Sequence, residues 1–136
     1  IDVYVAWSEI CSSAAVRFEQ SKQGFDIAEH HLAPRVLSAR EYVNLKRAMF
    51  EVTSNALKYG THEGGVYSAR TLSDGSLEFV ATNKINGHPD VTDCSHRGLL
   101  NIKTRIAELG GDLTIQTHDL APAESQFVVT LTLPLS

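Results

Sequence analysis

The sequence predicts an α/β two-layer sandwich, in which a mixed, mostly antiparallel sheet of about five strands carries helices on one face. Three observations predict this fold class. Helix-like and strand-like periodicities alternate along the chain. Ser73-Asp-Gly-Ser76 joins two strand-like segments as a hairpin turn does, which makes those neighbours antiparallel. A length of 136 residues suits one domain with its own core, and we expect residues 1–136 to form it.

The first part of the chain predicts a helix, a short strand and a long central helix. Apolar spacing indicates a helix over residues 2–22, and strand-like alternation begins at Phe25. Ser38 is followed three residues later by Glu41, which is a capping box. The central helix is therefore expected over residues 39–59. The first helix is expected to bury one face made of Val5, Ile10, Ala14, Ala15 and Phe18.

The second part of the chain predicts strands around one further helix. The stretch 84–97 is polar, contains Gly and Pro and shows no period, which is typical of a functional loop or lid. Before this lid we expect a loop at 61–65 and strands at 66–72 and 77–83. After it we expect a helix at 98–109, a strand at 112–118, a loop at 119–125 and a strand at 126–134.

One edge of the central helix is polar. Glu51, Asn55 and Lys58 stand at i, i+4 and i+7, so they share a face roughly a quarter-turn from the apolar stripe. Such an edge has two interpretations, an ordinary solvated face or a binding site. Asn55 favours a site, because Asn forms helices poorly. Its side-chain oxygen suits Mg²⁺, which takes few protein oxygens and fills its shell with water and phosphate.

Composition excludes several classes of partner. A net charge of −4 argues against nucleic-acid binding. No apolar run approaches the roughly 20 residues that span a bilayer, so no membrane contact is expected. Cys11 and Cys94 form no metal-binding spacing and require no disulfide, which makes a reducing cytoplasm the expected location. A start without Met is expected for a piece of a longer chain.

Two motifs now resemble a known family. Glu51-x-x-x-Asn55-Ala-x-Lys58-Tyr59 resembles the N box of the GHKL ATPases, most closely that of sensor histidine kinases. Residues 97–111, from Arg97-Gly-Leu to Leu-Gly-Gly111, resemble the second glycine box and the helix after it. Residues 127–134 are similar to the family's last strand. The resemblance implies an ATP-binding catalytic domain on the Bergerat fold that uses ATP and Mg²⁺.

The resemblance also implies roles for individual residues. Glu51 would orient or activate the attacking group, and Asn55 would hold Mg²⁺ between the phosphates. Gly98 would open a helix whose N-terminal amides meet phosphate oxygens, as helix N-termini do for anions in general. The nucleotide-binding positions implied in this way are Asn55, Lys58, Tyr59, Asn83, Gly87, Arg97, Gly98 and Leu99.

The sequence departs from the family pattern in two places. The adenine-pocket motif Asp-x-Gly-x-Gly reads Asn83-Lys-Ile-Asn-Gly87, so an amide replaces the acid and Ile85 replaces a glycine. In the second box His96 replaces a glycine before Gly98. These departures favour an alternative function, a degenerate nucleotide- or partner-binding module without turnover.

Kinases of this family phosphorylate a His on a helical hairpin that also dimerises, and no such hairpin fits before residue 38. The expected partners are therefore separate phosphoacceptor and dimerisation helices and a downstream response regulator. The first hypothesis is the catalytic domain of a two-component sensor histidine kinase, in the cytoplasmic part of a longer sensor. The others are the module without turnover and another ATPase or serine kinase on the same fold.

Overall fold

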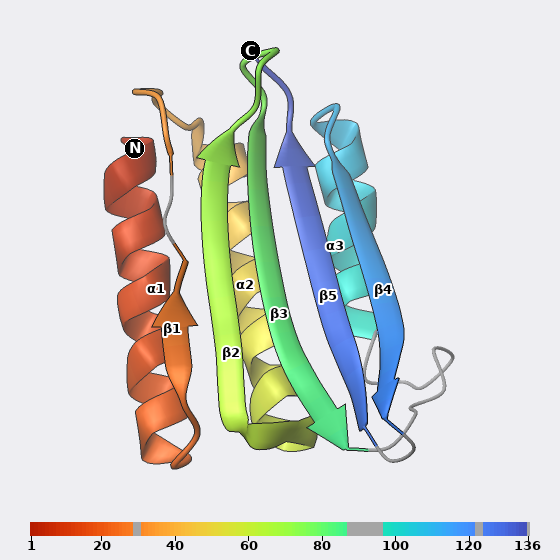
Figure 1. Ribbon diagram of the computed structural model, residues 1–136. Coiled ribbons are helices and arrows are strands. Elements are labelled where there is room, and N and C mark those ends of the chain that lie inside the picture. The colour runs from red at the N-terminus through yellow and green to blue at the C-terminus, as the bar shows by residue number, and fades with distance from the viewer. Residues whose placement is uncertain (29–30, 87–96, 122–123, 136) are drawn as a thin grey trace.

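The computed structural model describes residues 1–28, 31–86, 97–121 and 124–135 (Figure 1). The described residues form three helices and five strands. In chain order they are α1 (Val3–Gln20), β1 (Phe25–Ile27), α2 (Ala39–Tyr59), β2 (Gly60–Thr71), β3 (Leu77–Asn86), α3 (Arg97–Glu108), β4 (Asp112–Ala121) and β5 (Glu124–Leu133).

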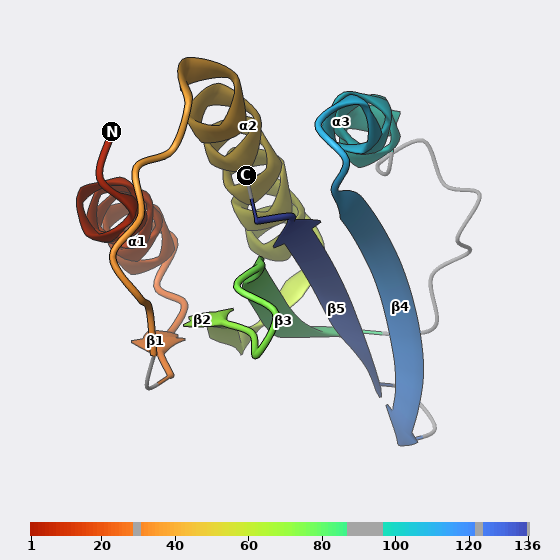
Figure 2. The ribbon, with the colours of Figure 1, turned by 90° about the horizontal axis from the view of Figure 1, so that it is seen from above.

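The sheet has the strand order β1-β2-β3-β5-β4. β1 pairs in parallel with β2, and the other neighbours are antiparallel. All three helices lie on one face of the sheet, as Figure 2 shows from above. The predicted two-layer sandwich with a mostly antiparallel sheet is therefore confirmed. None of the described helices is long and apolar enough to cross a bilayer.

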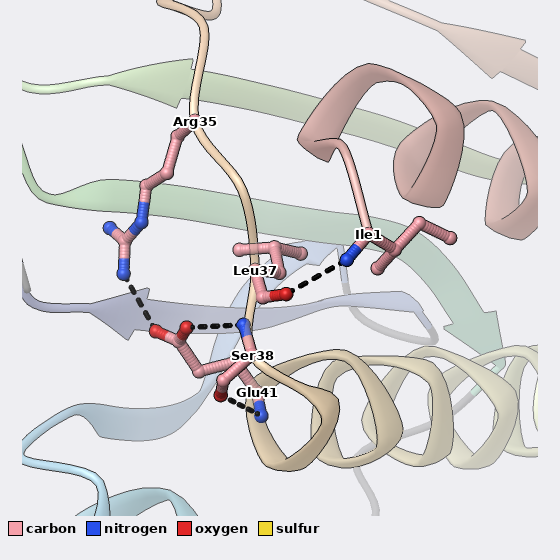
Figure 3. Close-up of polar contacts among 5 residues, drawn as sticks. All are labelled: Ile1, Arg35, Leu37, Ser38 and Glu41. Carbon is pink, nitrogen blue, oxygen red and sulfur yellow. Dashed lines mark hydrogen bonds and ion pairs between the residues drawn. The ribbon is translucent and has the colours of Figure 1, made fainter.

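The central helix α2 has the bounds expected from the sequence, and it begins where the capping box predicted. The Ser38 hydroxyl accepts from the Glu41 amide at 3.1 Å, and the Glu41 carboxylate accepts from the Ser38 amide at 2.9 Å (Figure 3). These two bonds satisfy amides that an uncapped helix start leaves unpaired. The apolar stripe of α2 lies in the core, against the sheet and both other helices: Leu45, Ala48, Met49, Val52 and Ala56.

Aromatic rings fill the space between α1 and the sheet. Trp7 lies 5.1 Å from Phe79 between ring centroids, and Phe25 meets Tyr67 edge-on at 4.9 Å. The predicted buried face of α1 was partly wrong, because Val5 is exposed and Trp7 is buried instead. Burial also raises the pKa of the Cys11 thiol to about 12, so this thiol stays protonated at neutral pH.

The expected loop at 61–65 was wrong, because these residues belong to β2. The pairing register of β2 with β3 shifts between Gly60 and Gly65. Gly64 has φ 75°, and a Cβ there would lie 1.5 Å from the carbonyl oxygen of Gly24. A glycine is therefore required for this close approach between chain segments. The glycine-rich composition of residues 61–65 predicted a loop, although these residues form a strand with a bulge.

Two other loop boundaries were also wrong. Residues 84–86, expected in the lid, continue β3 and pair with β5. Ile85 in that extension is buried, which holds the strand onto the core. β4 likewise continues to Ala121 and β5 begins at Glu124, so most of the loop expected at 119–125 is strand. The part of the lid at 87–96 lies outside the described residues.

A buried ion pair fixes the segment that leads into α2. Arg35 Nη2 lies 2.6 Å from Glu41 Oε2, and both side chains are nearly nine-tenths buried (Figure 3). Among the described residues, Arg35 Nε and Nη1 are buried without a hydrogen-bond partner. Compensation for the buried guanidinium charge therefore depends on Glu41. The neighbouring Leu37 carbonyl accepts from the Ile1 amino group at 2.9 Å.

We predict that Glu41→Ala lowers the free energy of unfolding by about 3 kcal/mol, because it leaves the Arg35 charge buried and unpaired and also removes the capping bond to the Ser38 amide. Urea unfolding followed by circular dichroism measures this. The matched control is Glu108→Ala, which removes the exposed pair between Arg40 and Glu108 at 3.7 Å and should change stability by less than about 1 kcal/mol. Equal effects of the two substitutions would contradict the buried-pair account.

Candidate functional site

The elements that carry the predicted site residues meet at one end of the sandwich. α2, β3 and β4 end there, and α3 and β5 begin there (Figure 1). Glu51 and Asn55 lie on the last turns of α2, Asn83 lies near the end of β3, and Gly98 lies at the start of α3. The fold therefore collects residues that are far apart in the sequence.

The helix-facing side of the sheet changes from apolar to polar at this end. On this side, residues that lie opposite one another on β3, β5 and β4 form rows across the sheet. A row nearer the middle of the sheet is apolar, as in Ala81, Val129 and Ile115. The next row toward the end contains Asn83 and Thr117 on either side of Phe127. The row after it contains the fully buried Ser125 between the buried, apolar Ile85 and Asp119, so this end is only partly polar. We call Asn55, Asn83, Thr117 and Ser125 the polar end.

Several polar atoms at the polar end are buried but unpaired. Within the described residues, Asn83 Nδ2, Thr117 Oγ1 and Asn55 Nδ2 are enclosed and have no hydrogen-bond partner. Asn83 is only 4% exposed. Each such group costs about 1–3 kcal/mol when it is left unsatisfied. The other buried unpaired atoms in the described part of the chain belong to Trp7, Gln23, Arg35 and Asn44, outside this group. At the polar end a polar ligand can complete the hydrogen bonds.

Glu51 and Gly98 bring α2 and α3 into close contact. A Cβ on Gly98 would lie 2.7 Å from Glu51 Oε2, so the glycine leaves the room that the carboxylate occupies. The carboxylate therefore lies beside the first turn of α3. The amides of a helix's first turn have no partner inside the helix, and they attract anions.

A pocket of about 450 Å³ opens between α2 and α3 beside the Glu51 carboxylate. Its lining combines that acid with basic side chains and the exposed ring of Phe50. The basic residues are Lys46, Arg47 and Arg105. This pocket gives a second molecule access to Glu51 from outside the sandwich.

The other predicted residues are placed as follows. Lys58 is exposed, with its ammonium 5.1 Å from the ring centroid of Tyr59, the last residue of α2. Arg97 and Leu99 lie in the first turn of α3, and the Leu99 side chain is buried in the core. Gly87 lies outside the described residues. The structure thus brings Glu51, Asn55 and Gly98 to one end with Asn83, whereas the Leu99 side chain serves packing.

Sequence reasoning missed Thr117 and Ser125. A signal was present, since Leu113 and Ile115 alternate toward the core and Thr117 continues that alternation as a polar residue. Ser125 precedes the inward-facing Phe127 by two positions in the same way. Its hydroxyl donates to Asp119 Oδ1 at 3.4 Å.

The site has few groups that hold metal ions directly. No group of three or more His, Cys, Asp or Glu side chains that could hold an ion occurs in the described part of the chain. Asn55 offers one carboxamide oxygen there. A single oxygen fits Mg²⁺ that is bound mainly through phosphate and water, whereas Zn²⁺ and Ca²⁺ require more protein ligands.

An exposed ion pair lies near the end of β3. Lys84 Nζ is 2.8 Å from Glu63 Oε2 on the neighbouring strand. The hydrogen bond and charge of Lys84 lower the pKa of Glu63, and Glu63 raises the pKa of Lys84 for the same reasons. Both groups are therefore charged at neutral pH. The pair ties the bulged start of β2 to the extension of β3.

Comparison with known proteins identifies the class of fold. The sequence matches no protein-family model and no curated protein. Solved structures of histidine kinases do match in fold. The histidine kinase domain of the Erythrobacter litoralis EL346 blue-light activated histidine kinase has a TM-score of 0.64 at 16% identity. The match covers 94% of this chain and 58% of that one, so this chain spans less than two thirds of that domain.

Two further structures match over nearly their whole length. The catalytic domain of histidine kinase ThkA has a TM-score of 0.66 at 15% identity, covering 98% of this chain and 94% of that one. The mycobacterial sensor histidine kinase MprB has a TM-score of 0.61 at 20% identity, covering 100% and 99%. The chain therefore has the fold of histidine kinase catalytic domains, which confirms the predicted Bergerat fold.

We predict that Thr117→Val raises the free energy of unfolding by about 1 kcal/mol without ligand, because it removes a buried unpaired hydroxyl. The matched control is Thr114→Val on the same strand. Thr114 points to the opposite face of the sheet, so the control has the same change in strand propensity. Urea unfolding without nucleotide or Mg²⁺ measures both variants. If Thr117→Val stabilises no more than Thr114→Val, the hydroxyl is not left unsatisfied.

Proposed function

We propose that this chain is the ATP-binding catalytic domain of a two-component sensor histidine kinase, which transfers the γ-phosphate of ATP to a histidine on a separate helical hairpin. The observation that carries this proposal is the set of buried, unpaired polar atoms of Asn55, Asn83 and Thr117 among the described residues. They lie at the end of a fold that histidine kinase catalytic domains share. A purine base and a phosphate chain offer the donors and acceptors that these groups lack.

Each part of the nucleotide has a complementary group at the polar end or at the start of α3. The base lies by Asn83, Thr117 and Ser125, between the sheet and the helices. The phosphates lie by the start of α3 at Gly98, where first-turn amides favour anions. Asn55 contributes its carboxamide oxygen to Mg²⁺. When bound, Mg²⁺ neutralises charge that develops on the phosphates during transfer.

Glu51 positions the attacking group. The acceptor imidazole reaches Glu51 from the pocket between α2 and α3. Glu51 accepts a hydrogen bond from one ring N–H, which leaves the lone pair on the other nitrogen directed at the phosphate. The new bond joins that nitrogen to the γ-phosphorus, the bond from the γ-phosphorus to the bridging oxygen breaks, and ADP leaves with the electron pair. Positioning supplies most of the catalysis in such transfers.

The partners proposed for this activity follow from the transfer. One is the phosphoacceptor hairpin, which also dimerises, and another is a response regulator that takes the phosphate onward. The basic side chains around Glu51 attract the nucleotide and an acidic acceptor surface. We place the domain in the cytoplasm, where ATP is available and where the Cys11 thiol stays reduced.

A second candidate function is nucleotide binding without turnover. Ile85 favours it, because this residue stands where the family has a glycine and lies buried within regular strand pairing to β5. The two candidates differ in one observable. Labelled ATP incubated with the domain and an added acceptor hairpin gives acid-labile phosphohistidine only in the first case, and nucleotide binding alone in the second.

We predict that Asn55→Ala abolishes the dependence of ATP affinity on Mg²⁺ while the domain stays folded, because the carboxamide oxygen is lost. Calorimetric titration of ATP with and without Mg²⁺ measures this, with circular dichroism as the check of folding. The matched control is Gln116→Ala, which removes an exposed carboxamide on the opposite face of the sheet and should keep the Mg²⁺ dependence. Unchanged affinity for Mg²⁺-ATP in folded Asn55→Ala protein would remove Asn55 from the metal site.

A further inference from the structure

Asn83 sets the hydrogen-bonding character of the proposed base site, which consists of Asn83, Thr117 and Ser125 and which we call the base pocket. Of the three residues with buried unpaired atoms at the polar end, Asn83 is the most enclosed, at 4% exposure. Its neighbours across the sheet are Gly65 and Phe127. Within the described residues, its Nδ2 donor is buried without a partner. A pocket with an enclosed donor at this position requires an acceptor from its ligand, or it leaves the donor unsatisfied.

Purine bases differ in what they present at ring position 6. Adenine carries an amine that donates beside N1, which accepts. Hypoxanthine and guanine carry an oxygen that accepts beside an N1–H that donates. A carboxamide has both an acceptor and two donors, so it can pair with either edge when it rotates by half a turn. An ionised carboxylate only accepts, so at ring position 6 it pairs with the adenine amine and repels the 6-oxo oxygen, although it can still accept from the N1–H beside that oxygen.

The other groups of the pocket are adaptable as well. The Thr117 hydroxyl donates or accepts as the ligand requires, and the Ser125 hydroxyl can do so when it turns away from its long 3.4 Å bond to Asp119. The nearby carboxylate is that of Asp119, which is exposed and accepts from the Ser125 hydroxyl. None of the four residues of the polar end is itself ionised. Selection between 6-amino and 6-oxo purines, which needs a fixed donor or acceptor, therefore has no basis in these four side chains.

We propose that Asn83 makes this pocket a general purine site, which binds 6-oxopurine nucleotides nearly as well as adenine nucleotides. The inference rests on the proposed function, since it names the class of nucleotide that the same site takes. Asn83 is the residue that determines specificity. Its carboxamide turns one way to pair with adenine and the other way to pair with hypoxanthine or guanine.

The test compares ADP with inosine diphosphate (IDP), because the two differ only at position 6 and in the proton on N1. Calorimetric titrations with Mg²⁺ use the domain, Asn83→Asp and the control Gln116→Glu. The control makes the same amide-to-acid change at an exposed side chain on the opposite face of the sheet. It therefore reports the effect of one added negative charge on phosphate binding alone.

In the unaltered domain we expect IDP to bind within about tenfold of ADP. Asn83→Asp should tighten ADP and weaken IDP, so that the preference for ADP rises by about tenfold or more, since bonds to ionised groups are stronger. Gln116→Glu should shift both affinities equally.

Two results would overturn the inference while leaving the proposed function in place. One is a preference for ADP of about a hundredfold or more in the unaltered domain, a measurement that needs no variant to fold. The other is an ADP-to-IDP ratio that Asn83→Asp does not change. If neither nucleotide binds the unaltered domain, the proposed function fails, and this inference fails with it.

Discussion

The packing of α2 against one face of the sheet is the constraint on which the rest of the structure depends. Its apolar stripe is buried in the core shared with both other helices, and the capping box and the ion pair of Arg35 with Glu41 fix where the helix begins. A helix of 21 residues that starts at one end of the sandwich must finish at the other. Glu51 and Asn55 are thereby carried to the end where β3 stops and α3 begins.

The polar end is formed at the expense of stability. Cross-strand rows that are apolar near the middle of the sheet give way to Asn83, Thr117 and Ser125 toward one end. Buried polar atoms that lack partners within the described residues destabilise the unliganded fold. Other buried polar atoms without partners in the described part of the chain belong to Trp7, Gln23, Arg35 and Asn44, so this cost is not confined to the polar end. A ligand at the polar end would offset its part of the cost. Stability and binding thus compete for the same residues.

The sequence predicted the fold and the central helix well, for identifiable reasons. Ser38 and Glu41 are local signals three residues apart, and the apolar stripe repeats over the whole of α2. The extension of β3 was missed because Ile85 stands among polar residues, and only its pairing with β5 reveals a strand.

Thr117 and Ser125 were not predicted as site residues for a related reason. Their significance appears only when cross-strand register places them beside Asn83 on the helix-facing side. Gly64 was likewise ambiguous, because its close approach to Gly24 is a long-range contact. Local sequence patterns thus predicted the helices and strands. Which polar residues belong to the candidate site depends instead on strand pairing and burial, which involve residues far apart in the sequence.

The central claim is that the nucleotide binds at the polar end and not in a pocket elsewhere in the molecule. A competing pocket of about 400 Å³ lies between α1 and α2, lined in part by Glu9, Arg17 and Lys46. Two-dimensional amide NMR spectra recorded during titration with Mg²⁺-ADP distinguish the two places directly. The account predicts the largest shifts at Asn83, Gly98, Thr117 and Ser125. Shifts concentrated at Glu9, Ser13 and Arg17, which line only the competing pocket, with the polar end unchanged, would contradict it.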